Sequence, residues 1–236
     1  MLTYIQPFDE FESFPPLEKA MIYPNGLLAI GGDLSAPRLL HAYRRGIFPW
    51  FSENEMIHWW SPDPRMVLYP AEFHISRSLK KSIRKNDFYY SMDRAFEEVI
   101  QACAEPRKSQ QGTWITKEMQ QAYIRLHKMG KAHSVEIWKD SQLVGGLYGI
   151  AIGRVFFGES MFSRVTDASK AAFLSLTRIL DESGFELIDC QVYSEHLETL
   201  GAREIDRKFF EKLLQQYCSE ELQQLTALEA QRLSLV

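Results

Sequence analysis

The sequence lacks the residue patterns that most often mark metal and nucleotide sites. Its three cysteines, Cys103, Cys190 and Cys218, stand far apart, with no C-x-x-C pair and no neighbouring histidine at zinc-ligand spacing. Neither G-x-G-x-x-G nor the P-loop pattern occurs, and the stretch 160–167 (SMFSRVTD) contains no glycine. We therefore expect free thiols in a reduced compartment, no metal, and no ordinary nucleotide or coenzyme A loop in that stretch.

Long apolar runs and a strong net charge are also absent. No stretch of 18 apolar residues occurs, and the first 20 residues have acidic side chains early and no basic region, so we expect no membrane contact, no signal peptide and a cytoplasmic location. The formal net charge of -4 argues against a protein that coats nucleic acid over its whole surface, so any basic patch must be local. The 236 residues are enough for one large domain, or for a small domain joined to a larger one.

Hydrophobic periodicity and turn residues predict an α+β fold. Thr116 and Asp167 stand where helix caps are expected, and Asp140-Ser141 and Gly153 break an apolar stretch where tight turns are expected. The expected elements are helices at 35–46, 75–85, 92–104 and 116–130, three antiparallel strands within 133–160, a helix at 167–184, a buried strand at 185–192, and helices at 206–217 and 219–235. This order predicts a mixed, mainly antiparallel sheet flanked by helices.

The segment 46–65 (GIFPWFSENEMIHWWSPDPR) places five large aromatic residues among three prolines. Residues before proline are pushed out of the α region, so this segment is expected to be extended. We take its end as the boundary between a small N-terminal domain, residues 1–63, and a larger domain, residues 64–236. Trp59 and Trp60 lie next to this boundary and are expected to pack between the two domains.

The stretch 74–85 (HISRSLKKSIRK) contains basic residues and no acidic residue. At about 100° per residue, the basic side chains fall within an arc of roughly 140°, with the apolar residues opposite. They are Arg77, Lys80, Lys81, Arg84 and Lys85. A solvated helix face is the ordinary interpretation, but an unmixed basic stripe in an acidic protein favours a phosphate backbone as its partner.

Glu159 follows an apolar run and has four large apolar neighbours in sequence. One interpretation is a carboxylate at a strand end that is satisfied by backbone N–H groups or by Arg164. The other is a functional carboxylate in an apolar setting, which binds a cation or a developing ammonium group.

Asp189 and Gln191 are expected on the same face of one strand, because side chains alternate along a strand. A buried aspartate is uncommon unless it is paired. Asp189 therefore either anchors the connection between sheet and loop or orients a polar partner at a reaction centre. A serine hydrolase triad has little support, since no G-x-S-x-G elbow is present.

Taken together, these motifs resemble one family, the leucyl/phenylalanyl-tRNA–protein transferases, which are bacterial enzymes that add an amino acid from aminoacyl-tRNA to the N-terminus of a protein. The matching stretches span residues 25–204 and include NGLLAIGGDLS, LLHAYRRGIFPWF, WWSPDPR, HISRSLKKS, GTWIT, AYIRLHKMGKAHSVEIW, LVGGLYGIAIGRVFFGESMFS, ASKAA, LIDCQV and LGARE. The resemblance implies a small N-terminal domain and a larger C-terminal domain similar to the GNAT acetyltransferases. It also implies no separate cofactor, because the acyl donor is the aminoacyl ester of tRNA.

The resemblance further assigns binding roles. The terminal adenosine and the aminoacyl end of tRNA would be surrounded by Tyr43, Phe48, Trp50, Trp114 and Tyr123. The leucine or phenylalanine side chain, with methionine as a further candidate, would occupy an apolar pocket lined by Leu147, Phe156, Met161 and Ile188. The basic stripe would hold the acceptor stem by its phosphates, which suits an enzyme that accepts several tRNAs.

By the same resemblance, the catalytic residues would be Asp189, Gln191 and Glu159. The reaction is aminolysis of an ester by the α-amine of an acceptor protein. Asp189 and Gln191 would form an activating pair for this amine, although a neutral glutamine is a poor base and suits a positioning role better. Family acceptors begin with arginine or lysine, for which Glu159 is one candidate acidic contact. We expect a monomer.

Two other functions fit parts of the sequence. An acyl-CoA-dependent GNAT N-acetyltransferase would have the same order of sheet and helices, and coenzyme A binding would discriminate it. A non-catalytic RNA-binding module would account for the basic stripe and the aromatic residues, and it predicts no activity that depends on Asp189 or Gln191.

Overall fold

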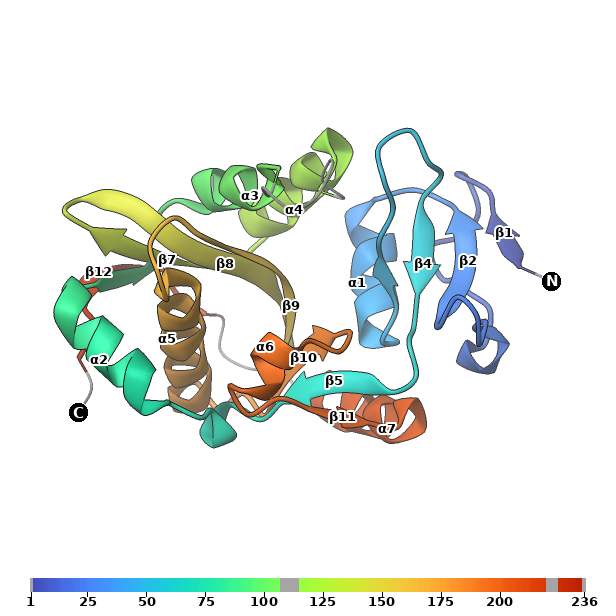
Figure 1. Cartoon of the computed structure of the whole chain (residues 1–236). Coiled ribbons are helices and arrows are strands. Elements are labelled where there is room, and N and C mark those ends of the chain that lie inside the picture. Colours follow the sequence, from blue (N-terminus) through green and yellow to red (C-terminus); the bar gives the residue numbers. More distant parts are fainter. Residues whose placement is uncertain (1, 107–114, 220–224, 235–236) are drawn as a thin grey trace.

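The fold, seen in a computed structural model, is described for residues 2–106, 115–219 and 225–234. It contains a small sheet near the N-terminus and a larger sheet formed by the rest of the chain (Figure 1). The α+β class expected from the sequence is confirmed.

The small sheet has the strand order β1-β2-β4-β3, with β1 and β2 parallel and the other pairs antiparallel. Its strands are β1 (Thr3–Ile5), β2 (Leu27–Gly31), β3 (Phe48–Pro49) and β4 (His58–Trp60), and helix α1 (Ala36–Arg44) joins β2 to β3. Trp59 is fully buried inside this part, where its Nε1 donates to the Gly31 carbonyl and its ring meets Phe14 edge-on. These two partners lie in the N-terminal part, but Trp59 also belongs to a core cluster that contains residues of both parts, so its expected packing between the domains stays a prediction.

The larger sheet has the strand order β11-β5-β10-β9-β8-β7-β6-β12. Its strands are β5 (Arg65–Leu68), β6 (Tyr89–Met92), β7 (Ala132–Lys139), β8 (Gln142–Ile152), β9 (Val155–Ser163), β10 (Leu187–Gln191), β11 (Arg203–Ile205) and β12 (Leu228–Arg232). The accompanying helices are α2 (Arg77–Asn86), α3 (Phe96–Ala104), α4 (Lys117–Lys128), α5 (Ala168–Glu182), α6 (Glu195–Glu198) and α7 (Arg207–Tyr217). Among these strands, β9 and β10 pair in parallel and the other neighbours pair antiparallel.

Turn and cap residues in the sequence correctly predicted the central strands of this sheet and helix α4. The three-stranded meander β7-β8-β9 is confirmed, and its first turn has both Asp140 and Ser141 in the left-handed region, as a tight hairpin requires. Helix α4 begins where expected, because the Thr116 side chain accepts a hydrogen bond from the Met119 backbone N–H. Asp167, in contrast, does not cap α5; it has a positive φ and its carboxylate contacts Lys170 instead.

The end of the chain differs from the sequence expectation. A helix was expected over 219–235, but residues 228–232 form strand β12, which pairs antiparallel with β6. The preceding residues 220–224 lie outside the described part. Strand β6 was itself unexpected, and the helix expected at 92–104 begins only at Phe96. This difference has a tertiary cause. Strand β12 covers the free edge of β6, and Leu225 and Leu233 are buried beside it. These contacts outweigh the local helix propensity of the segment.

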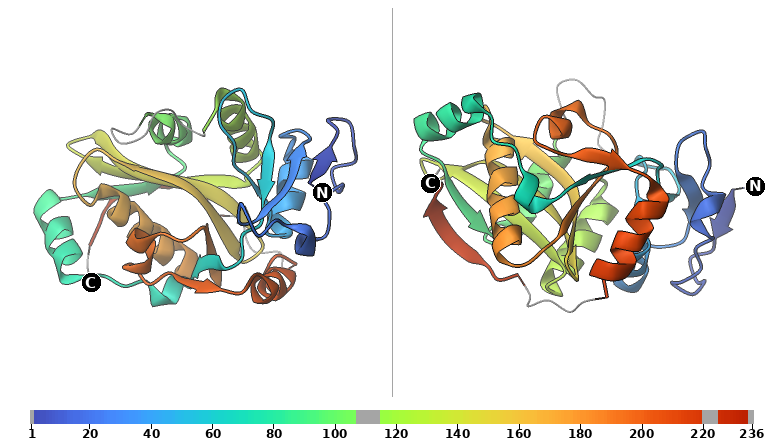
Figure 2. Two further views of the ribbon diagram at one scale, coloured as in Figure 1. Left: turned by 45° about the vertical axis from the view of Figure 1, so that its right-hand side comes forward. Right: turned by 90° about the horizontal axis from the view of Figure 1, so that it is seen from below.

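Helices cover both faces of the larger sheet (Figure 2). Helices α2 and α5 bury one face, with Leu79, Leu176 and Leu180 in its core, while α3 and α4 bury the other. The core on the side of α3 and α4 continues into the N-terminal part, since it contains both Tyr43 of α1 and Phe157 of β9. The small sheet therefore shares a hydrophobic core with the larger one, and the division at residue 63 stays a prediction.

Arg65 forms a buried ion pair inside the larger sheet and also contacts the N-terminal part. Arg65, at the start of β5, donates from Nε and Nη2 to the two carboxylate oxygens of Asp189 at 2.8 and 2.6 Å, and both side chains are almost fully buried. Its Nη1 donates to the carbonyl of Gly46, and its guanidinium lies over the rings of Phe48 and Phe210. Gly46 has φ +72° and a Cβ there would lie 2.9 Å from the Phe210 ring, so this junction needs glycine.

We expect Asp189→Asn to lower the free energy of unfolding by about 3–5 kcal/mol, because it leaves the Arg65 charge buried without a counter-charge. Denaturant unfolding followed by circular dichroism measures this. The control is Glu72→Gln, which removes the exposed ion pair with Arg203 and should cost less than about 1 kcal/mol. Equal effects of the two substitutions would show that Arg65 and Asp189 are not a structural junction.

Candidate active site

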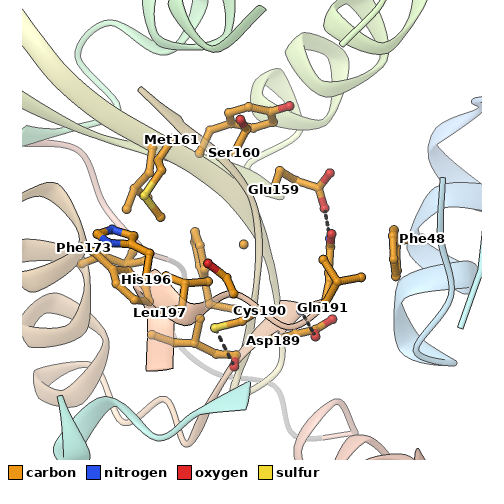
Figure 3. Close-up of a pocket in the computed structure, with 18 of the residues that line it drawn as sticks. Phe48, Glu159, Ser160, Met161, Phe173, Asp189, Cys190, Gln191, His196 and Leu197 are labelled. Atoms are coloured by element: carbon orange, nitrogen blue, oxygen red, sulfur yellow. Dashed lines mark hydrogen bonds between the residues drawn. The ribbon is translucent and has the colours of Figure 1, made fainter. Parts of the chain in front are cut away.

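A cavity of about 510 Å³ opens where β9 and β10 separate, next to the N-terminal part (Figure 3). Its walls come from β3 and the residue after it, from β8, β9 and β10, from α5 and from the region of α6. Pairing of β9 with β10 ends at Phe157 and Asp189, and β10 is irregular after Asp189, so the residues that follow on both strands are free to line a cavity.

Glu159 lies at the polar end of this cavity and is partly exposed. Its Oε1 accepts hydrogen bonds from the Tyr43 hydroxyl at 2.7 Å and from Gln191 Nε2 at 2.8 Å, and its Oε2 accepts one from the Tyr123 hydroxyl at 2.8 Å. Arg164, one expected partner, pairs with Glu105 instead. Burial raises the pKa of Glu159 to about 7, and hydrogen bonds that are donated to its ionised form oppose this rise. A carboxyl group with this pKa can both take and give a proton at neutral pH.

Tyr43 and Tyr123 stand behind Glu159 and do not line the cavity. Both side chains are fully buried, and burial raises the pKa of both hydroxyls well above the usual value. They were expected to contact the adenosine, but their enclosed rings offer no free face in this structure. What they contact is the carboxyl group of Glu159.

The side chains of Gln191 and Asp189 contact different groups. Gln191 has φ +66°, which turns its amide toward Glu159, and its backbone N–H donates to Asp189 Oδ1 at 2.9 Å (Figure 3). Asp189 does not reach the amide of Gln191; its carboxylate is bound by Arg65. The expected side-chain pair is therefore replaced by a backbone contact, and the interpretation of Asp189 as an anchor gains support.

The other end of the cavity is apolar. The expected pocket residues Leu147, Phe156, Met161 and Ile188 all line it. Leu176, which the family resemblance connects with the shape of the pocket, also lines it, whereas Phe173, His196 and Leu197 line it without having been identified from the sequence as part of a site. Phe173 and Leu176 belong to the apolar stripe of α5, which looks like ordinary core in a sequence. Burial lowers the pKa of His196, so its ring is neutral at neutral pH.

Aromatic side chains stand at the side of the cavity nearest the N-terminal part. Phe48 and Trp50 both line it, and Trp50 keeps 43% of its surface exposed. Trp60 donates from Nε1 to the Trp50 carbonyl, which holds the backbone of this segment in place. Trp114, the remaining expected aromatic, lies outside the described residues. Cys190 also lines the cavity, but burial raises the pKa of its thiol far above the usual value, so it is a poor nucleophile.

The basic stripe lies on α2. Its five side chains, Arg77, Lys80, Lys81, Arg84 and Lys85, are all exposed, whereas Leu79 and Ile83 of the same helix are buried. Helix α2 packs on α5, and α5 contributes Phe173 and Leu176 to the cavity. Helix α5 therefore contacts the helix that carries the basic stripe and also lines the cavity.

Two absences hold for the described residues. Within them, no group of three or more His, Cys, Asp or Glu side chains is arranged to hold a metal ion. No helix in the described ranges is long and apolar enough to cross a membrane.

Among solved structures, the chain is similar to a GCN5-related N-acetyltransferase from Kribbella flavida, with 14% sequence identity and a TM-score of 0.36 over 71% of this chain and 58% of that one. It is also similar to L-PGS from Bacillus licheniformis, with 12% identity and a TM-score of 0.39 over 72% of this chain and 57% of that one.

Curated sequences are much closer. A leucyl/phenylalanyl-tRNA–protein transferase of Nitrosomonas europaea is 63% identical over 203 residues, which is 86% of each chain, and one of Methylococcus capsulatus is 57% identical over 217 residues, which is 92% of each. The family model described as leucyl/phenylalanyl-tRNA protein transferase matches residues 67–215, and the model of its N-terminal domain matches residues 32–63. The chain therefore belongs to the leucyl/phenylalanyl-tRNA–protein transferase family and is an aminoacyltransferase.

Proposed function

We propose that this enzyme moves leucine or phenylalanine from aminoacyl-tRNA to the α-amine of proteins whose first residue is arginine or lysine, and that it does so as a cytoplasmic monomer. The observation that carries the proposal is a single cavity with an apolar end and a polar end, in a chain of this family. The apolar end suits the side chain of the transferred amino acid. The polar end suits the ester and the attacking amine.

The apolar end supplies selectivity by burial. Aliphatic, aromatic and thioether side chains surround it, from Leu147, Phe156, Met161, Phe173 and Ile188. Burying a leucine or phenylalanine side chain there would contribute roughly 1.5–3 kcal/mol. A charged side chain would lose its hydration without gaining a partner, so the same surface rejects it.

The polar end supplies proton transfer and orientation. The α-amine must lose a proton as it becomes an amide nitrogen, and the ribose oxygen must gain one as it leaves. Glu159 faces the cavity and its pKa of about 7 suits this exchange. The Gln191 amide, held beside it, suits a positioning role.

Asp189 supports the site without touching the reactants. Its carboxylate is fully buried, is paired with Arg65 and accepts the backbone N–H of Gln191. A carboxylate already held by a guanidinium and an amide is a poor base. We therefore assign it the task of fixing the unusual backbone of Gln191.

Recognition of tRNA is assigned to two surfaces. Phe48 and Trp50 at the cavity suit the terminal adenosine, since aromatic rings stack on any unpaired base. Trp114 keeps the same assignment as a prediction. The exposed basic stripe of α2 suits the phosphates of the acceptor stem.

The function is tested by a transfer assay. Leucyl- and phenylalanyl-tRNA with labelled amino acids are incubated with peptides that differ only in the first residue. We expect label on peptides that begin with arginine or lysine and none on a peptide that begins with aspartate, with no effect of coenzyme A. Absence of label on every peptide would refute the function, and transfer of acetyl groups from acetyl-CoA would support an acetyltransferase instead.

Substituting Glu159 by glutamine tests the proton-transfer role. The amide keeps the shape of the side chain and one acceptor oxygen but cannot exchange a proton, so kcat should fall by about 100-fold or more. The KM for aminoacyl-tRNA and the thermal unfolding midpoint should stay close to those of the wild type. The control is Glu229→Gln, since Glu229 is 91% exposed on β12 and should tolerate the change. A kcat for Glu159→Gln equal to that of the control would remove Glu159 from the chemistry.

The basic stripe is tested by charge reversal. The double substitution Lys80→Glu, Lys81→Glu should weaken tRNA binding at least about 10-fold at low salt and reduce the slope of log affinity against log salt by about one to two. The matched control reverses Lys208 and Lys212, which are exposed on α7 and change the net charge equally. Filter binding at several salt concentrations measures both. If the two double variants bind tRNA alike, overall charge and not α2 governs binding.

A further inference from the structure

Three oxygen atoms at the polar end of the cavity form a closed triangle. The hydroxyls of Tyr43 and Tyr123 lie 2.5 Å apart. Tyr43 is also 2.7 Å from Glu159 Oε1, and Tyr123 is 2.8 Å from Glu159 Oε2. The two tyrosines come from α1 and α4, so three distant segments meet at this point.

Counting protons distinguishes the two states of Glu159. Each tyrosine hydroxyl has one proton to donate. If Glu159 is ionised, two protons serve three contacts; when both are donated to the carboxylate, the two hydroxyl oxygens face each other at 2.5 Å with no proton between them. If Glu159 carries a proton, three protons serve three contacts, since Tyr43 donates to Glu159, Glu159 donates to Tyr123, and Tyr123 donates to Tyr43.

Neither tyrosine can relieve the contact between the two hydroxyl oxygens by losing its proton or by moving its ring. Burial and the nearby carboxyl group raise the pKa of both hydroxyls well above the usual value, so neither one ionises near neutral pH. Both residues are fully buried and their rings are packed, with Tyr43 against Phe157 and Tyr123 against Tyr148. The remaining variable is the proton on Glu159.

We propose that Tyr43 and Tyr123 are positioning residues that keep a proton on Glu159 in the resting enzyme, so that Glu159 enters the reaction as an acid. This inference rests on the proposed function for the reaction it serves, but its geometry does not depend on the identity of the substrates. It gives the two tyrosines a task other than contact with the adenosine.

The other groups around Glu159 act in both directions. Asp189 on β10 raises the pKa of Glu159 through its negative charge, and Arg65, the nearest cation to Asp189, is already paired with that carboxylate. Gln191 donates one hydrogen bond, which favours the ionised form. Tyr148 on β8 has a fully buried hydroxyl with no hydrogen-bond partner among the described residues, so it does not supply a donor.

The reaction step then balances without a further reagent. The neutral α-amine nitrogen attacks the aminoacyl carbonyl carbon and a C–N bond forms. The bond from that carbon to the ribose oxygen breaks, and the proton of Glu159 goes to this oxygen. The surplus proton on the new amide nitrogen goes to the Glu159 carboxylate. The products are an amide and a free ribose hydroxyl, and Glu159 is protonated again.

The direction of a pKa change tests the proposal. In the substrate-free protein, infrared difference spectra between wild type and Glu159→Gln isolate the carboxyl band of Glu159, and its loss with rising pH gives a titration midpoint. When Glu159 is protonated, Tyr123→Phe removes two hydrogen bonds, one to Glu159 and one to Tyr43. When Glu159 is ionised, the same change removes one hydrogen bond to Glu159 and also removes the repulsion between the two hydroxyl oxygens, so it favours the ionised state. We expect Tyr123→Phe and Tyr43→Phe each to lower the midpoint by about one pH unit.

The opposite sign would overturn the proposal. If the tyrosines simply donate to a carboxylate, their removal raises the midpoint, and an unchanged midpoint would show that they do not act on it. Tyr148→Phe is the matched control, since it removes an equally buried hydroxyl outside the triangle and should leave the midpoint near the wild-type value. A downward shift of the same size in this control would also refute the proposal. Because no tRNA is used, failure here is separate from failure of the transfer assay.

Discussion

The structure depends on one buried charge pair, Arg65 with Asp189. Neither group would be stable alone in this interior, because an unpaired buried charge costs several kcal/mol. Their pairing orders the rest: Arg65 also binds the Gly46 carbonyl and lies between the rings of Phe48 and Phe210, while Asp189 fixes the backbone of Gln191. One interaction thus holds the N-terminal part, the β10 strand and the polar end of the cavity in a single arrangement.

The chemistry of the site follows from where that arrangement leaves Glu159. Strand β9 carries Glu159 past the last residue that pairs with β10, so its carboxyl group faces the cavity on one side. On the other side it meets two tyrosines from helices on different parts of the chain. Burial of the carboxyl group raises its pKa toward neutrality, and hydrogen bonds donated to the ionised form keep that rise moderate.

Local chemistry explains which parts of this structure the sequence could predict. The meander and helix α4 depend on turn and cap residues that lie next to one another in the chain, such as Asp140 with Ser141, and the basic face of α2 depends on helical spacing alone. Strand β12 could not be predicted, because its reason is the uncovered edge of β6. The same holds for the partner of Asp189, which lies 124 positions away, and for the link between Tyr43 and Glu159, 116 positions apart. The pocket residues came from a family resemblance, and Phe173 shows the limit of that route.

The shared core has a consequence for how the protein is made. Tyr43 and Phe48 leave the ribosome early, but Phe157 and Phe210, which cover the same core, are synthesised more than a hundred residues later. The inner face of the first part must therefore wait, uncovered, until most of the chain has emerged. Contacts of such high sequence separation form slowly and expose apolar surface meanwhile. The part that carries Tyr43 and Phe48 is thus completed only after Phe157 and Phe210 have been synthesised, and until then its apolar inner face is open to aggregation.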